Sequence, residues 1–268
     1  MKPVNFLFFV IIFFSQPVFA DLIKGDLTPG GLIHAFLPPN SSATLNGKNI
    51  FVASDGLLVF GFGRNAKKRQ ILVVKTADGK IKHRSFQLKP RKYLVQRIDG
   101  LPKNMVTPPQ AYWARIKHEA KILNTVRRLT SKRRDFLNGF IWPVKGRVSG
   151  VYGSQRILNG KPRRPHSGID IAAPQGTLIR AAASGKILLS HPGMFYTGKT
   201  IVIDHGCGVS TIYIHLSKTV IREGQEVKKG AIIGEVGETG RATGPHLHWG
   251  LTWNGVNLDP SLVVRSDE

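Results

Sequence analysis

The sequence predicts a mainly β protein, in which a small β-sandwich-like domain and a connecting helix precede a larger antiparallel-sheet domain. Three observations support this fold class. The dipeptides Asn46-Gly47, Asp55-Gly56 and Asp78-Gly79 are typical of type I′ hairpin turns, and they separate short apolar runs. One stretch, 110–136, has apolar residues at three- and four-residue steps, as a helix does. After residue 140 the sequence returns to short strand patterns broken by glycine.

The first domain is expected at residues 21–107. Its apolar runs have the length and spacing of strands in a small antiparallel sandwich. These runs are Ile50–Ala53, Leu57–Phe60, Ile71–Val74 and Ile81–Leu88. The domain holds no constellation of residues that indicates catalysis.

The connecting helix is expected within residues 108–138, after Pro108-Pro109 closes the first domain. The periodicity predicts a helix from Gln110 to about Phe136, ended by Asn138-Gly139. Its apolar stripe predicts the face that packs on one of the two domains. The stripe consists of Tyr112, Ile116, Ala120, Leu123 and Val126.

The second domain is expected at residues 139–268. Lys199–Ile203 and Ser210–Ile214 flank a turn at 204–209 and predict a hairpin. Glycines in the segment 226–237 suit sharp sheet corners or a close approach of backbones.

Four histidines and one carboxylate in this domain indicate a zinc site: His166, Asp170, His215, His246 and His248. A catalytic zinc ion takes three protein ligands of these types and keeps one open position. Pro165 and Gly168 favour a loop that enters a strand around the first two residues. In His246-Leu247-His248 the histidines are two apart, so on a strand both point to one side and Leu247 points into the core.

Residues 142–260 resemble peptidase family M23, the zinc metallopeptidases of the lysostaphin or LytM type that cut peptides of bacterial peptidoglycan. The resemblance rests on the segments Gly146–Arg156, Arg164–Thr177, Ala181–Lys186, Tyr213–Ser217 and Gly240–Trp249. It implies that His166, Asp170 and His248 bind one Zn²⁺ per chain. It implies that His215 and His246 are catalytic histidines that do not bind the metal.

The resemblance also implies an antiparallel sheet with a narrow groove and zinc at its floor. We expect the groove walls at Ser154–Arg164 and His191–Lys199. His205 resembles a family position and is expected to orient backbone. Nothing local indicates a function for the four other histidines, His34, His83, His118 and His191.

The implied function is a secreted zinc-dependent endopeptidase that hydrolyses peptide cross-links or stem peptides of peptidoglycan. Neither HExxH nor HxxEH occurs, so the general base is expected to be His215 or His246, and the sequence does not decide which. An unperturbed histidine pKa near 6.5 predicts a neutral to mildly alkaline optimum. Two alternatives stay open: a non-catalytic LytM-like regulator of a cell-wall amidase, and a peptidase that acts on host or competitor proteins.

The first domain could hold peptidoglycan, dock a protein regulator, cover the groove, or only position the enzyme. The sequence distinguishes none of these roles.

The first 20 residues predict a signal peptide, with Lys2 before the apolar run Phe6–Phe14 and a cleavage site after Ala20. The alternative is an uncleaved anchor, although the run is shorter than the ~20 residues of a span. Export predicts a periplasmic, envelope-associated or secreted protein. Cys207 is the sole cysteine, so no internal disulfide forms, and we expect it to be buried rather than nucleophilic.

The formal net charge of +23 indicates an anionic partner or surface. Because an exported hydrolase meets the cell envelope, we expect peptidoglycan and an anionic envelope surface as partners. No nucleic-acid-binding motif accompanies the charge, so no nucleic acid is expected.

Overall fold

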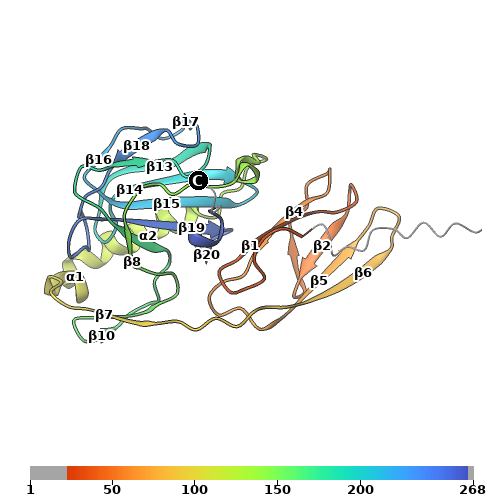
Figure 1. Ribbon diagram of the computed structural model, residues 1–268, viewed down its shortest axis with the longest axis horizontal. Coiled ribbons are helices and arrows are strands. Elements are labelled where there is room, and N and C mark those ends of the chain that lie inside the picture. Colours follow the sequence, from red (N-terminus) through yellow and green to blue (C-terminus); the bar gives the residue numbers. More distant parts are fainter. Residues whose placement is uncertain (1–22, 265–268) are drawn as a thin grey trace, which may run out of the picture.

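Antiparallel β-sheet dominates both lobes of the protein, which confirms the fold class that the sequence predicts (Figure 1). The computed structural model describes residues 23–264, and the expected signal peptide lies outside them. No helix in that range is long and apolar enough to cross a membrane.

The N-terminal lobe contains a two-stranded and a four-stranded sheet. The first pairs β1 (Leu32–Phe36) with β4 (Leu57–Gly61), and the second has the order β3 (Lys48–Ile50), β2 (Ser42–Leu45), β5 (Arg69–Lys75) and β6 (Ile81–Gln87). Alternate residues of β5 are buried, and Phe60 of the first sheet packs against Phe86 of the second, with ring centroids 6.2 Å apart. The expected sandwich-like packing therefore forms, with strands close to the apolar runs of the sequence.

The expectation of three type I′ turns is correct at one site and wrong at two. Asn46 and Gly47 both have positive φ, 51° and 77°, as a type I′ turn requires. At the other two dipeptides the aspartate does not, and only Gly56 and Gly79 are left-handed, with φ of 94° and 82°. Each of these glycines donates its N–H to the carbonyl three residues earlier, so it follows a wider turn.

The C-terminal lobe is built on an eight-stranded sheet. Its order is β17 (Glu226–Val227), β13 (Gly185–Met194), β14 (Gly198–Gly206), β15 (Val209–Leu216), β19 (His246–Trp253), β11 (Ile169–Ala172) and β8 (Arg147–Gly150), with β20 (Val256–Leu258) paired to β19. A smaller sheet joins β12 (Leu178–Arg180), β18 (Ile232–Glu235) and β16 (Lys218–Thr219). The predicted hairpin is β14–β15, and its tight turn contains Cys207, which is buried.

The connecting helix is shorter than the periodicity predicts. A 3-10 turn (Gln110–Tyr112) leads into α2 (Trp113–Val126), whereas the expected helix continued to about Phe136. Beyond α2 the backbone turns to the large sheet: the Cys207 N–H donates to the Ser131 carbonyl at 2.9 Å, and the Ser131 hydroxyl donates to Asp204 at 2.6 Å. These tertiary hydrogen bonds replace those of a continued helix.

The face of α2 that packs also differs in part from the expected stripe. Leu123 and Val126 pack on the large sheet as expected, but Tyr112 and Ala120 are exposed. Glu119 is buried instead, because it accepts hydrogen bonds from Arg115 and from the Phe195 N–H, both at 2.7 Å. A charged residue on the packing face was not readable from apolar periodicity.

The chain crosses between the lobes before β7 (Val95–Ile98). This strand pairs in parallel with β9 (Gln155–Leu158), and β9 pairs with β10 (Lys161–Pro162), so β7 lies against the C-terminal lobe. The short α1 (Lys103–Val106) follows on the same side (Figure 1). The sequence-based limits 21–107, 108–138 and 139–268 remain predictions, and residues 95–107 lie with the second lobe rather than the first.

The two lobes pack directly on each other. Arg91 forms an ion pair with the buried Asp259, and the Arg64 Nε–H donates to the Gly153 carbonyl at 2.6 Å. A Cβ added at Gly61 would lie 2.7 Å from the Leu258 side chain, so that side chain packs directly on the Gly61 backbone. One core of buried residues extends through both lobes.

His205 is a buried structural residue, as the sequence led us to expect. Its Nδ1 lies 2.7 Å from the Ser184 carbonyl and its Nε2 lies 2.7 Å from the Thr211 hydroxyl. A carbonyl only accepts, so Nδ1 carries the proton and Nε2 accepts from Thr211. Burial lowers the pKa of His205 to about 4.

The buried His205 predicts acid sensitivity of the fold. The ring is neutral in both states above pH 6.5, but between pH 6.5 and about 4 only the unfolded chain binds the proton. The free energy of unfolding should therefore fall by about 1.4 kcal/mol per pH unit from this residue, about 3 kcal/mol in all. Urea unfolding from pH 8 to pH 4.5 measures it. His205→Gln should be less stable at pH 8 but lose less on acidification; identical pH slopes would contradict the prediction.

Candidate metal centre

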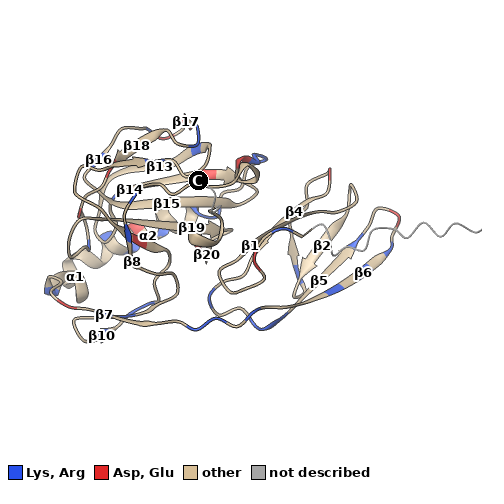
Figure 2. Ribbon diagram, in the orientation of Figure 1, with Lys and Arg blue, Asp and Glu red and all other residues tan. Residues whose placement is uncertain are grey.

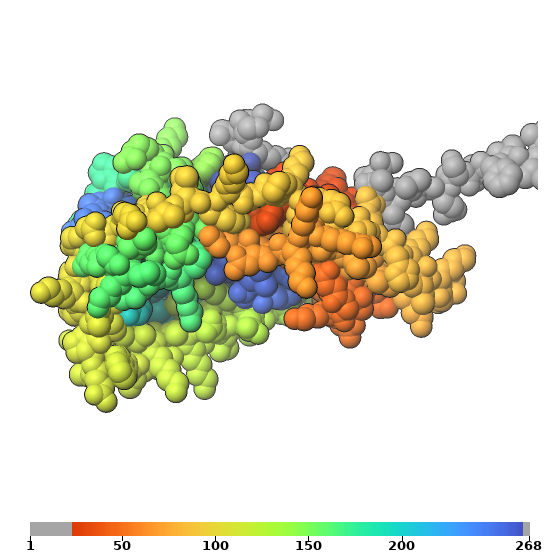
Figure 3. Space-filling model, turned by 90° about the horizontal axis from the view of Figure 1, so that it is seen from below, coloured from red at the N-terminus to blue at the C-terminus, as the bar shows by residue number. Residues whose placement is uncertain are grey.

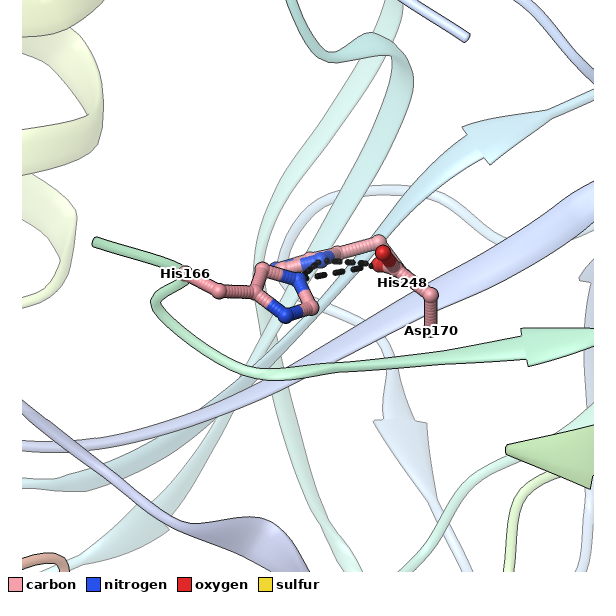
Figure 4. A group of neighbouring side chains, drawn as sticks. All are labelled: His166, Asp170 and His248. Carbon is pink, nitrogen blue, oxygen red and sulfur yellow. Dashed lines mark hydrogen bonds and ion pairs between the residues drawn. The ribbon is translucent and has the colours of Figure 1, made fainter. Parts of the chain in front are cut away.

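Three side chains of the C-terminal lobe converge on one point: His166, Asp170 and His248 (Figure 4). His166 Nε2 lies 3.0 Å and His248 Nδ1 lies 2.8 Å from Asp170 Oδ1. The two ring nitrogens are 2.9 Å apart. All three residues are buried.

Strand register places two of these residues opposite each other. Asp170 on β11 faces His248 on β19 in the antiparallel pair. His166 lies in the loop before β11, where its N–H donates to the Ser154 carbonyl at 2.9 Å. A Cβ at Gly168 would lie 2.3 Å from the Trp249 carbonyl oxygen, so this loop can cross the strand only with glycine there.

The donor atoms of the three residues are arranged for a cation. His166 Nδ1 lies 3.1 Å from the Val151 carbonyl, so Nδ1 carries the hydrogen and Nε2 of the neutral ring presents a lone pair. That lone pair faces the Asp170 carboxylate and His248 Nδ1. Burial lowers the pKa of His248 to about 4, so near neutral pH this ring carries no extra proton that could neutralise the Asp170 carboxylate. Two imidazoles and one carboxylate are a ligand set typical of catalytic zinc.

The Asp170 carboxylate is also held through its second oxygen, Oδ2. Burial by itself raises the pKa of Asp170, but the adjacent His166 and His248 rings outweigh it and hold the pKa well below the ordinary value. Arg156 on β9 forms an ion pair with Oδ2, and its Nε–H donates to Gln96 on β7 at 3.4 Å. Such outer contacts orient a metal ligand. The sequence did not reveal Arg156 or Gln96, because their contact with Asp170 is tertiary.

His215 and His246 form a pair beside this centre, with ring centroids 4.8 Å apart. His215 Nδ1 lies 2.7 Å from the Thr239 carbonyl, and His246 Nδ1 lies 2.8 Å from the Gly244 carbonyl. In both neutral rings Nδ1 therefore carries the hydrogen and Nε2 is free to accept a proton. His246 Nε2 lies 3.9 Å from Asp170 Oδ1.

The backbone of His215 is left-handed, with a φ of 69° near the end of β15. This conformation costs a non-glycine residue about 1–2 kcal/mol and is typical of functional sites. The His215 N–H donates to the Thr197 carbonyl at 2.9 Å, which holds the turn. Burial, and then the neighbouring His246 and His248, lower the pKa of His215 to about 3. The ring is therefore neutral throughout the physiological range.

A groove of about 250 Å³ opens over Asp170, His215 and His246. Its walls are formed by β7, by Arg156 and Leu158 of β9, and by the loop 241–245. Seen from below, β7 and β9 lie side by side and the surface beside them is hollowed (Figure 3). We expected the segment 154–164 to form a groove wall, and within it Arg156 and Leu158 line the groove. The segment 191–199 does not line the groove, and β7 was not anticipated because its pairing is long-range.

The sequence thus predicted five site residues that the fold brings together, and both histidines of β19 turn to one side while Leu247 is fully buried. The four histidines set aside are not among the groove-lining residues. The chemical roles of the five site residues remain predictions.

A family model described as Peptidase family M23 matches residues 164–260, the span that holds all five residues. A crystal structure from Pseudomonas aeruginosa assigned to peptidase M23 is 31% identical with a TM-score of 0.68, and the match covers 89% of this chain and 95% of that one. The chain belongs to peptidase family M23. The likeness to the Pseudomonas structure includes the N-terminal lobe, since it extends over nearly the whole of both chains.

Curated relatives of this M23 chain match over a shorter region. DD-carboxypeptidase/endopeptidase Mpg of Neisseria meningitidis serogroup B is 48% identical over 121 residues, which cover 45% of this chain and 28% of the relative. Peptidoglycan DD-endopeptidase ShyA of Vibrio cholerae is 40% identical over 119 residues, which cover 42% of this chain and 27% of the relative. This chain therefore matches little more than a quarter of their length.

Proposed function

We propose that the protein is an exported zinc-dependent endopeptidase that hydrolyses peptide cross-links or stem peptides of bacterial peptidoglycan. The observation that carries the proposal is the convergence of His166, Asp170 and His248 on one point, beside two groove-lining histidines whose Nε2 atoms are free. The names of the Neisseria and Vibrio relatives support the substrate class.

In this proposal His166 Nε2, Asp170 Oδ1 and His248 Nδ1 hold one Zn²⁺. Zinc in such a site polarises a scissile carbonyl and lowers the pKa of water towards about 7. Arg156 keeps the Asp170 carboxylate oriented from its far side. The Val151 carbonyl keeps the His166 ring in the tautomer that presents Nε2.

The two remaining histidines differ in their surroundings, which suggests different roles. His215 is buried and neutral, so its Nε2 is suited to accept the proton of the attacking water. The His246 ring is 17% exposed to the groove, where water can solvate its charged form. We assign His246 to donate a hydrogen bond to the oxyanion and a proton to the leaving amine.

The charge of the chain supports an envelope location for this activity. Figure 2 shows basic residues along the segment that joins β6 to β7, where Lys89, Arg91 and Lys92 lie. With a formal net charge of +23, long-range attraction would concentrate the enzyme on an anionic envelope surface. The predicted signal peptide would deliver it there.

The proposal predicts that residues 21–268, incubated with purified sacculi, release new muropeptides that mass spectrometry identifies. Cleavage should disappear in a chelated sample and return with added zinc. The mass of the fragments names the bond that is cut. A protein that contains zinc near one per chain but leaves sacculi intact would contradict the proposal. Activation of an amidase by this protein, without cleavage of its own, would establish the regulator instead.

A further inference from the structure

The guanidinium of Arg241 is a cation in the groove wall that has no acidic partner among residues 23–264. Arg241 lines the groove together with Asp170, His215 and His246. Among residues 23–264 its side chain forms no hydrogen bond or ion pair, and its ring contact is with Tyr196, whose centroid lies 4.5 Å from Cζ. The residue is half-buried, so water only partly replaces a partner.

The surrounding backbone holds Arg241 in this place. Its N–H donates to the Tyr196 carbonyl at 2.9 Å, and Gly240 before it is left-handed with a φ of 76°. A Cβ at Gly240 would lie 2.5 Å from the Gly198 nitrogen, so the loop packs tightly on the β13–β14 turn. The closely packed loop and the guanidinium held over an aromatic ring make a pre-organised binding group.

The charges around the groove leave Arg241 available for an anion. Asp170 is the one acidic residue among the groove-lining residues, and Arg156 already pairs with it. The Arg163 guanidinium donates to two backbone carbonyls, those of Pro162 and Val106. Burial lowers the pKa of Arg241, Tyr196 opposes this, and Arg156 and Arg163 lower it further, as expected where three guanidinium groups share one region.

We propose that Arg241 is the centre of a carboxylate-binding subsite, which takes a free carboxylate of the peptide substrate beside the bond that is cleaved. The inference rests on the proposed function and deepens it, because it restricts the substrate to peptides with an anionic group near the scissile bond. The planar fork of arginine matches a carboxylate with two parallel hydrogen bonds. In peptidoglycan peptides that carboxylate is either the C-terminus of a stem peptide or the side-chain carboxyl of its diamino acid.

Binding of an uncleaved ligand tests the subsite apart from catalysis. The probe is an uncross-linked disaccharide-tetrapeptide containing diaminopimelate, with two derivatives in which either the C-terminal or the side-chain carboxyl is amidated. Calorimetry measures Kd for the zinc-loaded chain 21–268. The wild type should bind one derivative about 10- to 150-fold more weakly than the native probe, the size of a charged hydrogen-bonded pair. The derivative that loses affinity identifies which carboxylate is bound.

Arg241→Gln should bind the native probe more weakly than the wild type does, by the same factor that amidation costs the wild type. It should bind the derivative that loses affinity no more weakly than the wild type does. Arg241→Lys keeps the positive charge but lacks the planar guanidinium. Its Kd for the native probe should lie between those of the wild type and of Arg241→Gln. Arg163→Gln is the matched control and should still discriminate between the carboxylate and its amide. Zinc content and thermal unfolding identify any variant that fails to fold, in which case the lysine variant decides.

The proposal is overturned if the wild type binds all three probes alike or none of them. It is also overturned if Arg241→Gln weakens all three equally, since the residue would then only support the loop. Discrimination in binding together with intact sacculi would retain the subsite and reject the peptidase. Cleavage of sacculi without discrimination would retain the peptidase and reject the subsite.

Discussion

Replacing His248 by alanine is expected to remove both bound zinc and cleavage of peptidoglycan. The substitution deletes one of three donor atoms that lie within 3.0 Å of one another. The metal content should fall from near one per chain to near zero. Because Lewis-acid stabilisation contributes several kcal/mol, kcat/KM should fall by at least about 10³-fold. Metal analysis and release of muropeptides measure the two effects.

His191→Ala is the matched control for this variant, because His191 lies outside the groove-lining residues and should keep both zinc and activity. Circular dichroism shows whether His248→Ala still folds. Full zinc occupancy in a folded His248→Ala protein would reject the ligand assignment.

Replacing His215 or His246 by alanine is expected to lower turnover by about 10²- to 10⁴-fold while zinc stays bound. Neither ring supplies one of the three converging atoms, and in each ring the hydrogen at Nδ1 is held by a backbone carbonyl. Steady-state cleavage of a cross-linked muropeptide, with metal analysis of the same samples, measures this. The loss should appear in kcat rather than in KM, since proton transfer is realised in the transition state.

Loss of zinc from either variant would contradict the assignment of these two histidines as residues that do not bind the metal. Because the pKa of His215 is lowered to about 3, this ring is neutral from pH 5 to pH 8. An acid limb of the activity profile in that range must therefore arise from another group. This differs from the expectation that an unperturbed histidine would set the optimum.

Local patterns predicted the parts of this fold that depend on neighbouring residues in the chain. The apolar run Ile71–Val74 forms part of β5, and the turn at 204–209 joins β14 to β15 as the flanking strand patterns predicted. Along a strand, side chains alternate sides with a two-residue period. The same period turned His246 and His248 to one side and buried Leu247. Asn46-Gly47 formed its type I′ turn because both residues tolerate positive φ.

Patterns failed where contacts distant in sequence outweigh local preference. The periodicity predicted a helix beyond Val126, but α2 ends there. Ser131 instead forms hydrogen bonds with Cys207 and Asp204 of the β14–β15 hairpin. A buried Glu119 took a place on the packing face of α2 because Arg115 and the Phe195 N–H satisfy its charge. Parallel pairing of β7 with β9 has no sequence signature, since the partners are some sixty residues apart.

The sequence by itself determined the strand-rich class and the hairpin that carries His215, because residue type and short spacing encode them. It also predicted five site residues, which the fold brings together. Only the tertiary structure decided that Asp170 faces His248 and that Arg156 holds the far oxygen of Asp170. It also decided that Arg241 lies in the groove without an acidic partner in the described part of the chain. The physical reason is that strand register and burial set which groups meet, and whether a charge finds a partner depends on residues far away in the chain.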